Sequence, residues 1–247
     1  MNELLENITM SDLSDMLVNL SKLTLNGKKH IKKYTKLRKL HSEIIDSMND
    51  YIMSDEYNLG NKFNYMLDTV KKEIPNLKVK LFSGDADDIT IIDELCIYKN
   101  HPKLTSVAEL YWQKKKYRNK EKIQMLKSML NSHASLFKIV ATDRANGYVT
   151  YEDVFTKKKY KVVDIAMSST FIDATENTLY MYNRIITFED ISFATGIHCM
   201  MTGDNKYLKE FIKKHKYKNC SDFARCLLIY DISKKEEMLV TKYNNKY

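Results

Sequence analysis

The chain has 247 residues, of which 44% are hydrophobic, and a formal net charge of +8. This length suffices for a substantial hydrophobic core without disulfides. No stretch approaches the roughly 18 uninterrupted apolar residues that a membrane-spanning helix needs. The acidic N-terminus lacks the apolar run of a secretion signal, and the four cysteines are scattered. We therefore expect a cytoplasmic protein with reduced thiols and no membrane contact.

Lysine carries most of the positive charge. The chain has 35 Lys and only five Arg, the latter at positions 38, 118, 144, 184 and 225. A net positive charge favours nucleic acid or another polyanion as a partner. Lysine is a point charge and lacks the bidentate fork with which arginine reads guanine. Binding to nucleic acid is therefore expected to use the phosphate backbone.

The first half of the chain has helical spacing. Residues 11–23 suit a helix, and residues 28–53 give the clearest helix of the sequence, with one apolar side that includes His41. We interpret His41 as a core residue. Lysines 28, 29, 32, 36 and 39 fall on the opposite side. This stripe is typical of the solvated outer face of a helix that packs on the core. A polyanion contact is the alternative, and the absence of Asp and Glu between Asp15 and Glu43 adds some support to it.

Further elements follow before the middle of the chain. We expect a helix over 60–73, stopped by Pro75, and a short strand over 77–82. The cluster Asp85, Asp87 and Asp88 lacks the glycine and final Glu of a calcium loop, so we interpret it as the N-cap of a helix in 89–98. Thr105 or Ser106 is expected to cap the next helix.

The segment 111–120, YWQKKKYRNK, combines the only Trp with two Tyr and five positive charges. Aromatic faces among cations suit single-stranded nucleic acid, because bases stack on the rings and phosphates pair with the charges. A helix end with core aromatics and lysines near the carboxyl-end dipole explains the same pattern. A further helix, with Leu126 and Met129 on its apolar side, leads to Ser132-His133.

Residues 136–197 are the only long region that reads as β-structure. Turn signals near 145–147, 156–159, 173–178 and 189–190 divide it into five runs rich in branched and aromatic residues, over 136–141, 148–155, 160–167, 179–188 and 191–197. We predict five strands in an antiparallel sheet or a small barrel. Beyond them, Gly203-Asp204 and Ser221-Asp222 are read as the starts of two helices. The expected regions are 1–133, mainly helical, 134–202, the β-module, and 203–247, helical, and together they are compatible with one compact domain.

Several motifs are missing from the sequence. The six glycines are too widely spaced for a phosphate-binding loop, no Gly-x-Ser-x-Gly occurs, and Cys220 and Cys226 are too far apart for a zinc knuckle. We therefore assign no catalytic residue, no metal ligand and no cofactor. The alternative is a metal-dependent hydrolase, nuclease-like, that uses Asp164, a nearby Glu and Lys161.

Residues 132–197 resemble a known arrangement. The runs SHASLFKI (132–139), GYVTYEDVFT (147–156) and YKVVDIAMS (160–168), followed by Asn183-Arg184-Ile185-Ile186, are similar to the small β-module of uncharacterised bacterial proteins in which a SEC-C metal-binding motif follows. The Cys-x-Cys-Gly-Ser-Gly type of tail is absent here. The resemblance implies a bacterial or phage-type cytoplasmic protein with an adaptor-like β-module.

These observations predict an α+β fold in which helices surround one antiparallel sheet. The expected function is that of a non-enzymatic binding protein whose basic helical faces contact nucleic acid or an acidic protein surface. A structural protein that forms homo-oligomers is a further alternative. The residues of the predicted interface are Lys28, Lys32, Lys36, Lys39, Trp112, Lys114, Lys115, Lys116 and Arg118.

Overall fold

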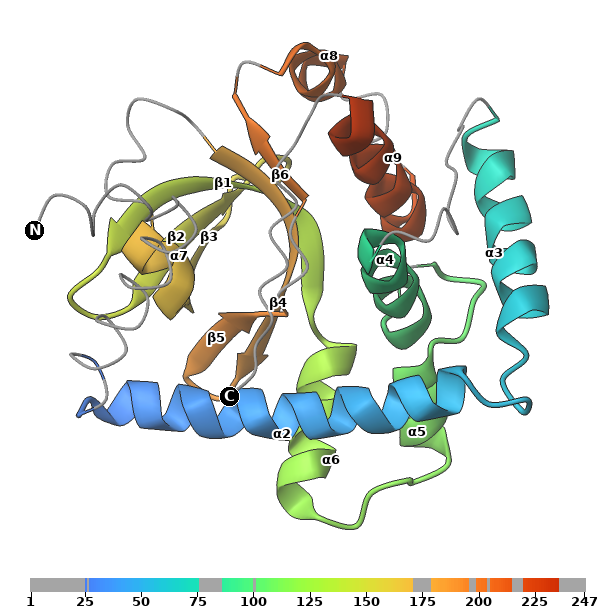
Figure 1. Cartoon of the computed structure of the whole chain (residues 1–247), viewed down its shortest axis with the longest axis horizontal. Helices are drawn as coiled ribbons and strands as arrows, with labels where there is room; N and C mark the ends of the chain where they lie inside the picture. The colour runs from blue at the N-terminus through green and yellow to red at the C-terminus, as the bar shows by residue number, and fades with distance from the viewer. Residues whose placement is uncertain are drawn as a thin grey trace, which may run out of the picture.

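The computed structural model describes residues 25, 27–75, 86–99, 101–170, 179–195, 199–203, 205–214 and 220–235. The fold is α+β, as the sequence predicts, and Figure 1 shows a curved sheet beside a group of helices. The described helices are α2 (Lys29–Ile52), α3 (Leu59–Glu73), α4 (Ala86–Ile97), α5 (Val107–Gln113), α6 (Lys120–Leu130), α7 (Ile165–Thr170), α8 (Lys206–Lys214) and α9 (Asp222–Lys235).

The sheet has six strands within the described residues. They are β1 (His133–Asp143), β2 (Tyr148–Asp153), β3 (Lys159–Val163), β4 (Leu179–Phe188), β5 (Ile191–Ala194) and β6 (Cys199–Thr202), in the order β1-β2-β3-β5-β4-β6. β1 also pairs with β4, which closes a hydrogen-bonded ring of five strands. Most pairs are antiparallel, but β3 and β5 are parallel where Val163 faces Phe193, so the sheet is mixed.

Alternation along the strands separates two buried clusters. Phe137 and Ile139 of β1 lie inside the ring with Tyr151 of β2 and Met181 of β4. Strand residues next to these in the sequence, such as Leu136 of β1 and Tyr182 of β4, belong to the larger buried cluster, which also includes residues of the helices. This is the two-residue period of a strand, and it places one face of the sheet in each cluster.

The strands differ from the prediction in some of their ends and in their number. The third predicted strand was expected to continue to Met167, but β3 ends at Val163 and residues 165–170 form α7. Asp164 explains the change, because its Oδ1 accepts a hydrogen bond from the Met167 amide at 3.0 Å and so caps the helix. The strand β6, over 199–202, was not predicted, and β5 ends at Ala194.

The helices agree closely with their sequence patterns. α2 buries the predicted apolar side, and His41 is buried with its Nε2 2.8 Å from the Tyr98 hydroxyl. Of the two candidate caps for α5, Ser106 forms a complete capping box with Glu109. α8 begins after Asn205, two residues later than expected, because the Asn205 side chain accepts from the Leu208 amide.

The large buried cluster includes side chains from all three predicted regions, among them Met48, Leu136 and Phe223. Within the described part of the chain, no helix combines the length and apolarity needed to cross a membrane. The helix predicted over 11–23, the strand predicted over 77–82 and Asp85 lie outside the described residues.

Candidate nucleic-acid interface

The exposed lysines of α2 follow from the helical period. Lys32, Lys36 and Lys39 lie opposite the buried side that holds Ile31, Tyr34 and Leu37, and all three lysines are exposed. Successive members are three or four residues apart, so they follow one face at intervals of about one turn. Lys32 and Lys39 form no ion pair with any residue that the structure describes. We call Lys32, Lys36 and Lys39 the α2 basic face.

Lys28 belongs to the same sequence stripe but has an internal contact. Its ammonium donates to the carbonyl of Ala145 and, at 2.7 Å, to Oδ1 of Asn146. His30 lies 2.8 Å from the Asn146 carbonyl through its Nε2 and stacks on Tyr148. Lys28 thus fastens the β1–β2 turn to the start of α2, and its side chain is only half exposed.

The second predicted group lies on the connection between α5 and α6. We call residues 112–119, which comprise the last two residues of α5 and the connection to α6, the α5–α6 loop. The chain leaves α5 through a tight turn in which Lys115 has a φ of 49° and the Lys116 amide donates to the Tyr111 carbonyl at 3.0 Å. This is the hydrogen-bond pattern of a Schellman cap. The turn contains three consecutive exposed lysines and follows Trp112, which is 44% exposed.

The aromatic residues of this segment have different roles. Tyr111 is buried and its hydroxyl donates to the Ser47 carbonyl at 2.7 Å, so the interpretation as a core residue is correct for Tyr111. Tyr117 is half-buried against the Tyr111 ring, 5.8 Å away. Only Trp112 presents a large part of its ring system to solvent.

The cations of the loop differ in whether they have a partner within the protein. Lys114 pairs with Glu56 at 3.2 Å, and this hydrogen bond, with the charge of Lys114, lowers the pKa of the Glu56 carboxyl. Lys116 lies 5.7 Å from the centre of the Tyr111 ring. Lys115 and Arg118 are exposed and form no ion pair with the described residues, which leaves both charges available to a ligand.

The start of α6, just after the α5–α6 loop, lies beside the α2 basic face, whereas Lys114 contacts Tyr51 and Glu56 at and beyond the other end of α2. Lys36 Nζ lies 2.5 Å from Oε1 of Glu121, and Lys122 Nζ lies 3.1 Å from Oε2 of Glu43. These contacts hold the first turn of α6 alongside α2, as Figure 1 also shows. The structure therefore brings the α2 basic face together with the end of the α5–α6 loop. It adds one exposed cation that the predicted set lacks, Lys120, although that residue ends the basic segment recognised in the sequence.

The basic face has a clear limit along α2. Glu43, Asp46 and Asp50 are exposed or lie at the edge of the same outer side, after Lys39. Positive charge is thus confined to the first half of the helix, where α6 begins.

The carboxylates of the β-module have structural partners. Asp164 caps α7 and accepts from the Tyr151 hydroxyl at 3.3 Å, while Lys161 lies over the Tyr148 ring. Within the described residues, no group of three His, Cys, Asp or Glu side chains is placed to hold a metal ion.

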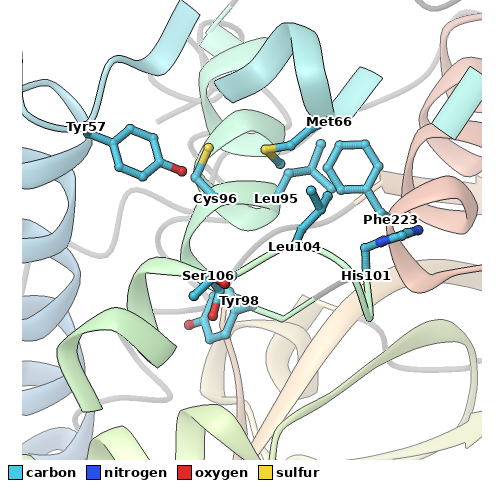
Figure 2. A pocket seen from close by; sticks show the side chains of 10 residues that line it. Tyr57, Met66, Leu95, Cys96, Tyr98, His101, Leu104, Ser106 and Phe223 are labelled. Atoms are coloured by element: carbon cyan, nitrogen blue, oxygen red, sulfur yellow. The ribbon is translucent and has the colours of Figure 1, made fainter. Parts of the chain in front are cut away.

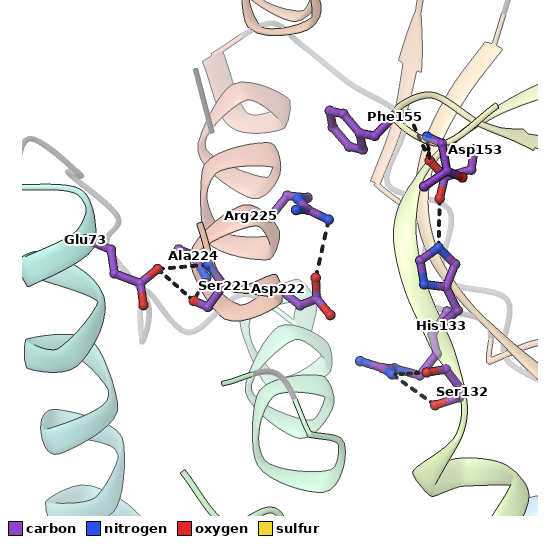
Figure 3. A network of polar contacts seen from close by, with 11 residues as sticks. Glu73, Ser132, His133, Asp153, Phe155, Ser221, Asp222, Ala224 and Arg225 are labelled. Atoms are coloured by element: carbon purple, nitrogen blue, oxygen red, sulfur yellow. Dashed lines mark hydrogen bonds and ion pairs between the residues drawn. The ribbon is translucent and has the colours of Figure 1, made fainter. Parts of the chain in front are cut away.

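Within the β-module, the imidazole of His133 contacts the buried carboxylate of Asp153 (Figure 3). His133 Nε2 lies 2.7 Å from Oδ2 of Asp153, whose Oδ1 accepts from the amides of Phe155 and Thr156. Burial acts to raise the pKa of the Asp153 carboxyl, but the hydrogen bonds from His133, the two amides and Ser135 outweigh it and hold the pKa at about 2. This carboxylate serves the turn that joins β2 to β3.

A small cavity lies between α3, α4 and α9 (Figure 2). Tyr57, Cys96, His101 and Phe223 are among its lining residues, and its free volume is about 10 Å³. That volume corresponds to roughly one water molecule. The cavity is too small for an organic ligand, so the surface formed by α2 and the α5–α6 loop is the better candidate for function.

Residues 28–243 match a family described as a family of unknown function, DUF7986. The chain belongs to this family. The match includes α2, the α5–α6 loop and the whole ring of strands, so the candidate interface lies inside the region that defines the family. Comparison with curated proteins and with solved structures gives no match.

Proposed function

We propose that the protein binds nucleic acid through its phosphate backbone, using the α2 basic face and the α5–α6 loop. The observation that supports this proposal is the position of Lys32 and Lys39. They are exposed, form no ion pair within the described residues, and share one face of α2 with Lys36, which contacts Glu121 at the start of α6.

The chemistry of the surface favours backbone contacts. Its cations are mainly ammonium groups, which pair with phosphates as point charges and do not read base edges. Binding is therefore expected to depend weakly on base sequence and strongly on salt. In this proposal the ring of strands is a scaffold, and the helices supply the contacts.

The test is a salt titration of binding to an oligonucleotide, with two charge-matched variants. Lys32→Gln/Lys39→Gln removes two charges from α2. Lys209→Gln/Lys213→Gln removes two exposed charges from α8, which lies far from α2 (Figure 1). The wild type should show a steep loss of affinity with salt. The α2 variant should bind more weakly, with a slope of log K against log salt that is smaller by about 2, and the α8 variant should bind as the wild type does.

Two results contradict the proposal. If the wild type does not bind nucleic acid at low salt, the surface has another partner, and binding to poly-glutamate in the same assay would indicate an acidic protein. If the α8 variant loses affinity and the α2 variant does not, the binding surface is on α8.

A further inference from the structure

The α5–α6 loop offers an exposed aromatic face as well as charge. Trp112 is 44% exposed in the last turn of α5, while the opposite side of that short helix is buried through Val107, Ala108 and Tyr111. The backbone position of Trp112 is thus determined by a helix that packs against the core. A tryptophan that solvent reaches at such a rigid position is available for stacking.

The surroundings of Trp112 are cationic. The Schellman turn places Lys114, Lys115 and Lys116 directly after Gln113, and Arg118 follows. Two of these side chains are held close to aromatic rings, since Lys114 Nζ lies 5.6 Å from the centre of the Tyr51 ring and Lys116 Nζ lies 5.7 Å from that of Tyr111. The segment 112–118 therefore carries an exposed indole and four exposed cations, although two of these cations lie near other rings.

We infer that the α5–α6 loop binds single-stranded nucleic acid, with an unpaired base stacked on Trp112 and the neighbouring phosphates paired with Lys115 and Arg118. This inference rests on the proposed function and specifies the form of the ligand. Duplex phosphates satisfy the cations equally well, but bases in a duplex are stacked on one another and have no free face for the indole. An acidic protein surface matches the charge but supplies no equivalent stacking partner.

The chain contains a single Trp, so tryptophan fluorescence reports Trp112 alone. The experiment titrates the full chain, at one fixed salt concentration, with a single-stranded oligonucleotide, the corresponding duplex and poly-glutamate. The single strand should quench the fluorescence, whereas the duplex and poly-glutamate should leave it nearly unchanged. Trp112→Leu should bind the single strand roughly 5- to 150-fold more weakly, the range expected for loss of one stacked base, and should bind the duplex as before.

Two further variants make the result specific. Trp112→Phe retains an aromatic face and should lose less affinity than Trp112→Leu. Tyr207→Leu removes another exposed aromatic, which also has a lysine, Lys206, 4.9 Å from its ring centre, but which lies on α8. The Tyr207 variant should bind the single strand as the wild type does.

The outcomes separate the inference from the proposed function. Equal affinity for single strand and duplex, without quenching and without an effect of Trp112→Leu, overturns the inference and leaves the backbone-binding function standing. Quenching by poly-glutamate equal to that by the single strand also overturns it. If neither nucleic acid binds at low salt, the proposed function fails and the inference fails with it.

Discussion

Arg184 of β4 donates a hydrogen bond from Nε to Oε1 of Glu94 in α4 at 2.6 Å, and both side chains are buried. The same guanidinium donates from Nη1 to the Ser132 hydroxyl at 2.9 Å and lies 4.4 Å from the centre of the Tyr98 ring. This ion pair joins β4 of the ring of strands to α4, which packs against α2 and α5.

Replacing one partner of the Arg184–Glu94 pair should lower the free energy of unfolding strongly. Arg184→Met leaves the Glu94 carboxylate buried without its cation, and we expect a loss of about 3–5 kcal/mol in the free energy of unfolding. Arg184→Met/Glu94→Leu removes both charges and should lose less than the sum of the two single variants. Urea unfolding measures these values. Arg225→Met is the control, since its partner Asp222 is partly exposed, and a loss equal to that of Arg184→Met would contradict the special role of the buried pair.

His41 should make the fold sensitive to mild acid. Burial, and to a smaller degree the charge of Arg38, lowers the pKa of His41 to about 3 from an ordinary 6.5. The folded state therefore takes up this proton less readily than the unfolded state, so the stabilisation is complete above pH 6.5 and falls as the pH decreases towards 3. At pH 5 the loss from this residue should be at most about 2 kcal/mol.

The measurement is the free energy of unfolding between pH 8 and pH 5 for the wild type and His41→Gln. The variant should be less stable at pH 8, because the contact between the imidazole and Tyr98 changes, but its stability should vary less over this range. A variant with the same pH dependence as the wild type would show that His41 is not responsible.

Local patterns in the sequence predicted the helices better than the closure of the sheet. α2 has 24 residues, enough to display its period and to place His41 in the core. Residues 165–167 form an apolar run that is too short to distinguish a strand from a helix. The hydrogen bond from the Met167 amide to Asp164 favours the helix α7 at this position. The β1–β4 pairing that closes the ring joins segments more than 40 residues apart, and no local signal specifies it.

The candidate interface was predictable in composition but not in detail. Lys28 and Lys32 are both lysines of the same predicted stripe. The Lys28 ammonium donates a hydrogen bond to Asn146, 118 residues along the chain, whereas Lys32 is exposed. Likewise, Tyr111 and Trp112 are neighbours, but the helical rotation of about 100° per residue buries the first and exposes the second. Such differences depend on tertiary contacts.

The capping box of α5 supports the helix that carries Trp112. Ser106 accepts a hydrogen bond from the Glu109 amide through its hydroxyl, and the Glu109 carboxylate accepts from the Ser106 amide. Ser106→Ala should lower the free energy of unfolding by about 1 kcal/mol. Thr105→Ala, at the exposed neighbouring position, should have little effect. Urea unfolding compares the two variants, and a larger loss for Thr105→Ala would refute the assignment of the cap.

The β1–β2 turn should tolerate no side chain at Gly147. This glycine has a φ of 69°, and a Cβ there would lie 3.1 Å from Cδ1 of Leu25 and 3.3 Å from Cδ1 of Ile31. Gly147→Ala should therefore lower the free energy of unfolding by about 1–2 kcal/mol, from backbone strain together with crowding against the start of α2. Gly60→Ala is the matched control: its Cβ would meet nothing within 4 Å, and an alanine in α3 should stabilise the protein by up to about 1 kcal/mol. Thermal or urea unfolding of both variants tests the pair, and equal changes of the same sign would show that the turn is not held against α2 in the way described.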